Sequence, residues 1–215
     1  MKSGGIDEVI SMRVGRPVFA FLIAVVMAAP AFSESPKDQI KKTTDQILSI
    51  LTNPLYKGPS KAEERRRLIR KAIDERFDWE GMAQRALGIH WGKRTVEERK
   101  EFVALFEELL ARTYMDKIEG YSGEKIVYAG ETIDGDKARA FVKIITSKNK
   151  EIPLEYRLQL KEAQWLVYDI SIEGVSLVNN YRTQFNSIIV KSGYEDLVKR
   201  LKEKQTYGDK KERRS

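Results

Sequence analysis

The sequence contains no cysteine and only one histidine among its 215 residues. Without thiols, the chain cannot form a disulfide, a thiolate nucleophile or a cysteine-ligated metal site. A single imidazole also cannot supply a zinc site built from several histidines. A glycine-rich phosphate loop is missing as well, so the common nucleotide-binding motifs are excluded. These absences remove several classes of enzyme before any secondary structure is considered.

Long hydrophobic runs are also missing, except for one near the N-terminus. Val18–Ala29 is unbroken and apolar, follows Arg13 and Arg16, and is followed by small residues. This run is shorter than the about 20 apolar residues that a membrane-spanning helix needs. The pattern is typical of a secretory signal peptide, which we expect to cover residues 1–33, and Met12 would be the better start for such a peptide. An uncleaved membrane anchor is the alternative.

Positive charge exceeds negative charge, with 39 Lys and Arg against 32 Asp and Glu and a formal net charge of +7. Part of the excess lies in the C-terminal segment 205–215, which we expect to be a basic, disordered tail. The alternative is a weak attraction of this tail to anionic headgroups or to an acidic partner. No nucleic-acid recognition motif accompanies the charge.

Helix-start signals dominate the first half of the predicted domain. A capping side chain precedes an apolar stripe at four places, which are Ser35 before Pro36, the pair Ser60 and Glu63, Asp78, and the pair Thr95 and Glu98. The helix that follows Thr95 carries two adjacent apolar stripes, a wider apolar arc than a surface helix has. We therefore expect this helix to be central.

After Gly123 the apolar period changes from 3.6 to two, which predicts strands at 125–133, 138–144, 152–160 and 165–173. Asp134-Gly135 predicts a tight hairpin between the first two strands. In the last strand, alternation is expected to place one set of side chains on each face, Leu166, Tyr168, Ile170 and Ile172 on one and Asp169, Ser171 and Glu173 on the other.

Two more helices are expected after this meander, from Ser176 to about Lys191 and from Tyr194 to Lys204. Helices, then a meander, then helices is the order of an α+β protein. The sequence therefore predicts a single domain over residues 34–204, with a four-stranded antiparallel meander covered by helices on one face.

Candidate catalytic residues are few, and each has an ordinary structural explanation. Ser176 lacks the second glycine of an esterase elbow and suits a helix N-cap. Glu107 and Glu108 are adjacent on a helix and diverge, so they would form its wet face. His90 and Asp169 could act as an acid or a base, but the plainer interpretations are a capping or surface role for His90 and a salt bridge or a solvent-facing position for Asp169.

Large apolar residues remain as candidates for a binding site. One interpretation is a solid core. The other is that sheet and helices close incompletely and leave a lipid-sized apolar cleft between them. The residues proposed for the wall of such a cleft are Phe77, Met82, Leu87, Phe106, Leu110, Tyr114, Val142, Leu154, Tyr156, Leu158, Tyr168, Ile170, Tyr181 and Phe185.

The chain resembles the MlaC family of periplasmic phospholipid-binding proteins, also called toluene-tolerance proteins. Four stretches carry the likeness, in the order expected for the family. They are FDWEGMAQRALGIHW (77–91), RTVEERKEFVALFEELLARTYMDKIEGYSGEKI (94–126), PLEYRLQLKEAQWLVYDISIEGVSLVNNYRTQF (153–185) and GYEDLVKRLKEK (193–204).

The resemblance implies a soluble carrier in the periplasm of a Gram-negative bacterium, with no catalysis, cofactor or metal. Its cargo would be phospholipid, held by the acyl chains in a deep apolar pocket. Its partners would be an inner-membrane ABC transporter with an MCE-domain subunit and an outer-membrane lipoprotein–porin complex. Under this resemblance we expect Tyr181 and Phe185 to flank the lipid cleft.

Two other functions stay open at this point. One is a small-molecule enzyme on a cone-shaped α+β fold, with Asp169 or His90 as the acid or base. The other is an adaptor with a solid core and no cargo. Both predict that no lipid copurifies with the protein.

Overall fold

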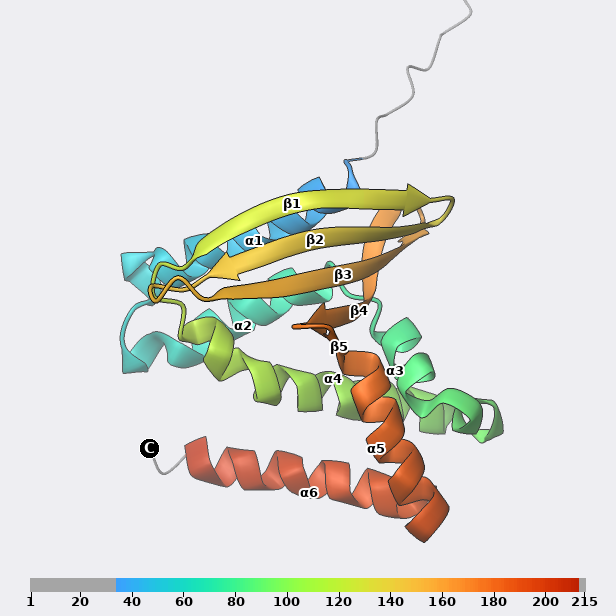
Figure 1. Ribbon diagram of the computed structural model, residues 1–215. Helices are drawn as coiled ribbons and strands as arrows, with labels where there is room; N and C mark the ends of the chain where they lie inside the picture. The colour runs from blue at the N-terminus through green and yellow to red at the C-terminus, as the bar shows by residue number, and fades with distance from the viewer. Residues whose placement is uncertain (1–33, 213–215) are drawn as a thin grey trace, which may run out of the picture. The chain divides into compact units, whose positions relative to one another are not determined.

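The computed structural model describes residues 34–212, so the predicted signal peptide over 1–33 and the start at Met12 lie outside the described residues. Four helices come first, then a sheet, then two helices (Figure 1). The helices are α1 (Pro36–Thr52), α2 (Ala62–Asp74), α3 (Trp79–Leu87), α4 (Val96–Glu119), α5 (Leu177–Ser192) and α6 (Tyr194–Glu212). The strands are β1 (Lys125–Asp134), β2 (Lys137–Ile145), β3 (Glu151–Lys161), β4 (Gln164–Ile172) and β5 (Val175–Ser176), and 3₁₀ turns cover Pro54–Tyr56, Pro59–Lys61 and Gly88–Lys93.

The sheet is an antiparallel meander in the order β1-β2-β3-β4-β5. It has five strands where the sequence predicts four, because the chain turns back at Glu173 and Gly174 and pairs two more residues with the end of β4. Both turn residues have positive φ, 49° and 82°, and Gly174 adopts this conformation without strain. The α+β class and the helix-covered antiparallel sheet are confirmed.

The sheet curves over α1, and the remaining helices lie below it (Figure 1). α1 packs against β1 and β2, whereas α4 packs against α3 and α6. Side chains from the C-terminal half of α4 and from the sheet border a common cavity. The covered face of the sheet therefore meets two different neighbours, a close one in α1 and a more distant one in α4.

A β-bulge changes the expected orientation of side chains in β4. Leu158 of β3 pairs with Val167, but Arg157 pairs with Asp169, so Tyr168 is an extra residue in the ladder. An extra residue reverses the alternation beyond it. The face toward α1 and the cavity is therefore Trp165, Val167, Ile170 and Ile172, and the expectation that Leu166 and Tyr168 share a face with Ile170 is wrong.

Most of the expected helix starts are confirmed. Thr95 and Glu98 form a complete capping box, and Ser35, Asp78 and Ser176 each accept a backbone hydrogen bond at an N-cap. The expected Ser60 capping box is wrong. Pro59 opens a 3₁₀ turn that contains Ser60, and α2 begins two residues later without a side-chain cap. At the other end of the chain, α6 continues beyond the predicted end at Lys204 to Glu212, into the segment that the composition marks as a tail.

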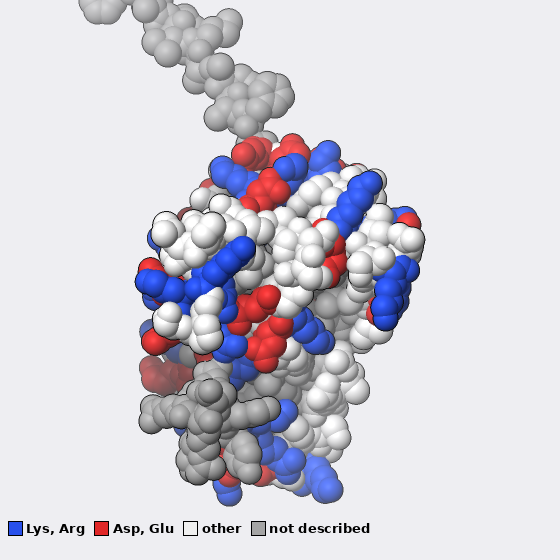
Figure 2. All heavy atoms as spheres, turned by 90° about the vertical axis from the view of Figure 1, so that its left-hand side faces the viewer, with Lys and Arg blue, Asp and Glu red and all other residues white. Residues whose placement is uncertain are grey.

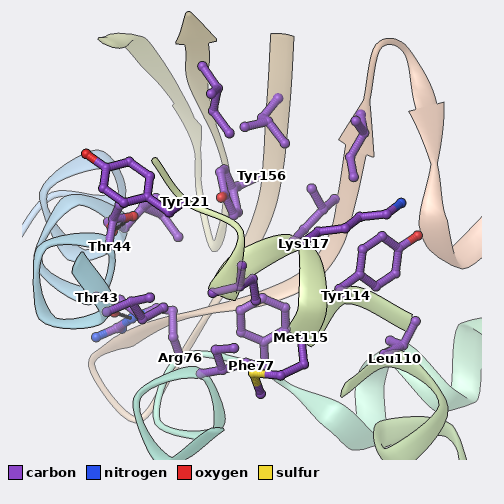
Figure 3. A pocket seen from close by; sticks show the side chains of 18 of the residues that line it. Thr43, Thr44, Arg76, Phe77, Leu110, Tyr114, Met115, Lys117, Tyr121 and Tyr156 are labelled. Carbon is purple, nitrogen blue, oxygen red and sulfur yellow. Dashed lines mark hydrogen bonds between the residues drawn. The ribbon is translucent and has the colours of Figure 1, made fainter. Parts of the chain in front are cut away.

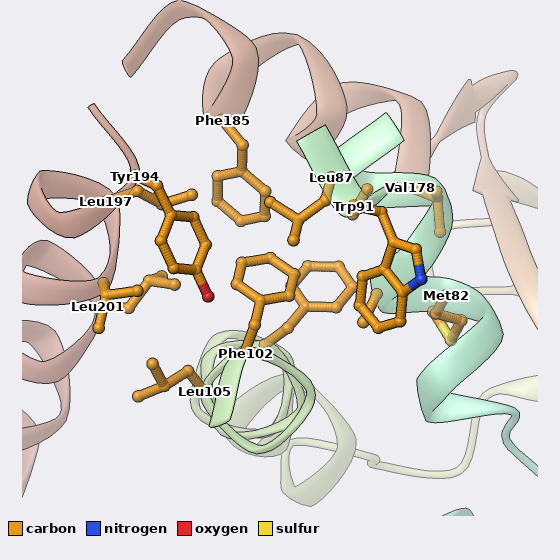
Figure 4. Close-up of a cluster of buried hydrophobic side chains, with 14 of the residues drawn as sticks. Met82, Leu87, Trp91, Phe102, Leu105, Val178, Phe185, Tyr194, Leu197 and Leu201 are labelled. Carbon is orange, nitrogen blue, oxygen red and sulfur yellow. The ribbon is translucent and has the colours of Figure 1, made fainter. Parts of the chain in front are cut away.

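Two hydrophobic clusters hold the domain together. One lies among α3, α4, α5 and α6 and includes Phe102, Phe106 and Phe185, whose ring centroids are 5.7–6.0 Å apart (Figure 4). The other lies between α1 and the sheet and includes Ile40, Ala140 and other small or branched residues. Phe77 packs against both clusters, so it marks where they meet.

Candidate binding cavity

A cavity of about 600 Å³ lies between the covered face of the sheet and helices α1, α2 and α4. Cavities of about 300–1,000 Å³ are the usual size for sites that bind small molecules. Figure 3 shows the side chains of its wall converging from α1, from α4 and from the strands. The cavity therefore occupies the space that α4 leaves open beneath the sheet.

The wall is mainly aliphatic and aromatic, and the periods of its elements explain why. α1 contributes one face of a helix, with Ile40, Thr43, Thr44, Ile47, Leu48 and Leu51. α4 and the residues after it contribute Leu110, Ala111, Tyr114, Met115, Ile118 and Tyr121. The strands contribute alternate residues, Ile126, Ile144, Ile152, Leu154, Tyr156, Ile170 and Ile172.

Tyr156 shows how deeply the cavity penetrates. Burial raises the pKa of its phenol to about 12, because a phenolate would lie far from solvent. Its side chain is nevertheless only partly covered by protein atoms, because it faces the cavity (Figure 3). The wall near Tyr156 is therefore an apolar surface remote from bulk water.

Arg76 is one of the charged residues that border the cavity. The guanidinium of Arg76 donates to the carbonyl oxygen of Trp165 at 2.9 Å, to Oγ1 of Thr43 at 3.2 Å and to Oε1 of Gln39. Burial lowers the pKa of Arg76, since the cation loses hydration there. These neutral acceptors tie α1 to the loop before α3 and to β4, which gives Arg76 a structural role.

Ion pairs join α2 to α4 along one side of the cavity. Arg70 binds Glu107 at 2.8 Å and Glu108 at 2.5 Å. Nearer the ends of the helices, Arg65 and Arg66 both bind Glu119, at 2.6 and 2.8 Å. The expectation that Glu107 and Glu108 diverge along the wet face of the helix is wrong, because both are only partly exposed and both bind Arg70.

Half of the fourteen side chains predicted for a cleft border this cavity. The seven on its wall are Phe77, Met82, Leu110, Tyr114, Leu154, Tyr156 and Ile170. The other seven lie elsewhere. The helical cluster contains Leu87, Phe106 and Phe185, and Tyr181 packs against it. Val142 and Leu158 are buried under α1, and Tyr168 lies on the far side of β4 beneath the guanidinium of Arg85. The cavity thus brings together predicted side chains from four different elements, which are α3, α4, β3 and β4.

The expected place of Tyr181 and Phe185 beside the main cleft differs from what the structure shows. Phe185 is 3% exposed and meets Phe102 and Phe106 edge to face. Neither residue borders the main cavity, and both border a smaller hollow among α4, α5 and α6. α5 turns away from the covered face of the sheet, so its aromatic stripe fills the helical core.

The residues that the prediction missed belong mostly to α1 and to the ends of strands. Ile40, Ile47 and Leu51 recur on one helical face, and this periodicity is the signal that could have identified them. Ile144, Ile152 and Ile172 are the terminal inward positions of β2, β3 and β4. Their alternation is visible in the sequence, but nothing local distinguishes them from ordinary core.

The candidate acid and base residues lie away from the cavity wall. Asp169 is 4% exposed and accepts hydrogen bonds from Oγ of Ser176 at 2.6 Å and from the amide of Val178 at 3.1 Å. It also forms an ion pair with Arg157, so the salt bridge is confirmed and the solvent-facing position is wrong. His90 is bonded to Asn186 at 2.9 Å on the surface. These contacts fix the start of α5 and the loop before α4.

The described part of the chain has neither a metal-ligand cluster nor a membrane-spanning helix. Residues 34–212 contain no group of three or more His, Cys, Asp or Glu side chains placed to hold a metal ion. No helix within the same range is both long enough and apolar enough to cross a bilayer. Figure 2, which faces the left-hand side of Figure 1, shows positive and negative side chains interspersed with uncharged ones.

Comparison with known proteins identifies relatives along most of the chain. The family model described as MlaC protein matches residues 41–203. The intermembrane phospholipid transport system binding protein MlaC of Haemophilus influenzae is 23% identical over 188 residues, which cover 85% of this chain and 88% of that protein. The toluene tolerance protein ttg2D of Pseudomonas putida is 20% identical over 182 residues, 84% of each chain.

A solved structure shares the fold. The phospholipid-binding protein from Ralstonia solanacearum, determined in complex with a phospholipid, superposes with a TM-score of 0.72 and 26% sequence identity. The match covers 80% of this chain and 98% of that one. The similarity therefore includes nearly all of the neighbour's domain.

Proposed function

From the finding that the chain belongs to the MlaC protein family, we propose that it binds phospholipid and carries it between membranes. The observation that carries the proposal is the apolar cavity of about 600 Å³ beneath the sheet. Each methylene group that leaves water for such a wall gains about 0.8 kcal/mol, so even part of an acyl chain would be held firmly.

The site that we propose for the acyl chains combines predicted and newly found residues. The inner part of the wall is formed by Phe77, Leu154, Tyr156 and Ile170. Helix α1 supplies the facing wall, with Ile47 at its centre. All of these side chains border the cavity, and none of them has a charged group that a hydrocarbon chain would have to displace.

The setting that we propose is the periplasm of a Gram-negative bacterium. The predicted signal peptide supports this location, and so does the similarity to a binding protein of an intermembrane phospholipid transport system. The proposed partners are an inner-membrane ABC transporter with an MCE-domain subunit and an outer-membrane lipoprotein–porin complex. A carrier with an apolar site of this kind would solve the problem of moving acyl chains across the aqueous space between these partners.

We propose no catalytic step for this protein. The two candidate acid and base residues of the enzyme alternative, Asp169 and His90, are bonded to other protein groups outside the cavity. No contact in the described structure brings either of them to the wall where a substrate would lie. The enzyme alternative therefore has no observation in its favour.

The experiment that tests the proposal is mass spectrometry of an organic extract of the mature protein, purified from a bacterial periplasm. We expect phospholipid in stoichiometric amount. A second arm measures transfer of labelled phospholipid from donor to acceptor vesicles. A folded protein that yields a clean extract and also takes up no phospholipid from vesicles would contradict the proposal. Binding to the isolated MCE-domain subunit, measured separately, tests the partner.

A further inference from the structure

The charged residues on the cavity wall differ in whether another protein group already forms a hydrogen bond or an ion pair with them. Six of the seven have hydrogen-bonding partners. Arg70 binds Glu107 and Glu108, Arg76 binds three neutral acceptors, Asp74 accepts from the indole of Trp79, Glu124 accepts from Ser122, and Glu173 binds Lys150. The remaining charged residue of the wall is Lys117.

Lys117 has no carboxylate partner among the residues that the structure describes. It lies in the last turns of α4, and its side chain is exposed. Its one described contact is with the ring of Tyr114, whose centroid is 5.1 Å from Nζ. In Figure 3 the two side chains lie together on the side of α4 away from Tyr121. The ammonium group therefore stands at the rim of the cavity with its hydrogen-bond donors available.

This position matches the chemistry of an amphiphile with a negatively charged head. Acyl chains would lie against the wall below, and the head would remain where water is accessible. An ammonium group at such a boundary can keep its hydration on one side and donate to a phosphate oxygen on the other. The aliphatic stem of Lys117 and the ring of Tyr114 would meanwhile cover the first methylene groups of the cargo.

We propose that Lys117 binds the phosphate group of the cargo at the cavity rim and thereby favours phosphate-bearing lipids over neutral ones. The proposal rests on the proposed function, because it assumes that acyl chains occupy the cavity. It adds a residue that selects cargo by charge, whereas the apolar wall selects it by hydrocarbon content. Lys117 would also set the depth of the cargo, since the ammonium fixes where the head lies.

The test compares Lys117→Gln with the parent protein and with a matched control, Lys148→Gln. Lys148 is an exposed lysine in the turn between β2 and β3, near the same end of the domain, and it does not border the cavity. Both substitutions remove one positive charge. Binding of phosphatidylglycerol and of a diacylglycerol with the same acyl chains is measured for each protein, with inorganic phosphate as a competitor.

We expect Lys117→Gln to weaken phosphatidylglycerol binding about three- to tenfold, the effect of losing one partly exposed charge-assisted contact. Diacylglycerol binding should be unchanged in both variants, and Lys148→Gln should match the parent. Raising the salt concentration should reduce the difference between parent and Lys117→Gln. Inorganic phosphate at millimolar concentration should not displace the lipid, because it lacks the acyl chains.

Three results would overturn the proposal. They are equal phosphatidylglycerol binding by Lys117→Gln and the parent, an equal loss in Lys148→Gln, or an equal loss of diacylglycerol and phosphatidylglycerol. A fourth result, displacement of the lipid by inorganic phosphate, would also overturn it and would assign Lys117 to a free anion instead of a lipid head. If the parent protein binds neither lipid, the proposed function fails, and this outcome is distinct from a failure at Lys117.

Discussion

Filling the cavity should separate lipid binding from fold stability, because the wall would gain packing while the cargo loses space. Ala111 is the position for this change. It lies in α4, it borders the cavity, and it is only partly buried although it is in the middle of a long helix. Replacing Ala111 with Trp would place an indole in the space that we assign to acyl chains.

The size of the effect follows from the area of the new side chain. A buried Trp covers up to about 200 Å², which at about 25 cal/mol per Å² equals the burial of about six methylene groups. Allowing for the methyl group already present, the cargo loses about five methylene contacts, or at most about 4 kcal/mol. That corresponds to about a thousandfold in affinity, and we expect at least a tenfold loss because acyl chains can shift toward the rim.

The assay is equilibrium binding of a labelled phospholipid, together with denaturant unfolding of the lipid-free protein. The control is Ala104→Trp, the same change on an exposed position of the same helix that does not border the cavity. Ala111→Trp should bind less lipid yet be at least as resistant to unfolding as the parent. A folded Ala111→Trp protein with unchanged lipid affinity, or an equal loss in Ala104→Trp, would refute the assignment of the cavity to acyl chains.

Three further predictions concern the contacts around the cavity. Glu119→Gln should lower the free energy of unfolding by about 1–3 kcal/mol, because the side chain of Glu119 is 11% exposed and binds two arginines. Asp116→Asn should change it by less than about 0.5 kcal/mol, because the side chain of Asp116 is 80% exposed. Equal effects of the two substitutions in urea unfolding would contradict this prediction. Burial alone would raise the pKa of Glu108, but hydrogen bonds from its two arginine partners outweigh it and lower the pKa below 4.5. The stabilisation that Glu108 contributes is therefore complete above that pH and is lost as the pH falls. Between pH 5 and pH 3, Glu108→Gln should lose less stability than the parent protein. Parallel losses of stability in the two proteins would argue against this linkage. Phe185→Ala should cost about 3–5 kcal/mol of stability, because Phe185 is buried in the helical cluster. Ile170→Ala should cost at most about 2 kcal/mol and should weaken lipid binding instead, because the side chain of Ile170 is packed on one side only and borders the cavity. Thermal unfolding and lipid titration of both variants would show whether this order is reversed.

The sequence alone was sufficient for the order and type of the main elements. The capping residues at Thr95 and Asp78 and the change of period after Gly123 act through neighbours a few residues away, so the helix starts and the change to strands can be derived without a tertiary structure. The α+β class follows from that order. The Ser60 start failed, because a proline just before it formed a 3₁₀ turn that a pattern of side chains does not reveal.

Only the tertiary structure could decide which apolar residues border a cavity. Tyr156 and Phe185 look alike in the sequence, since each belongs to a regular apolar stripe. Phe185 lies in the core and Tyr156 on the cavity wall, because the bundle of α4, α5 and α6 closes around Phe185, whereas α4 lies away from the sheet opposite Tyr156. The bulge at Tyr168 likewise depends on pairing with β3. Periodicity shows which face of an element avoids water, but what fills the space beyond that face is determined by how the elements pack.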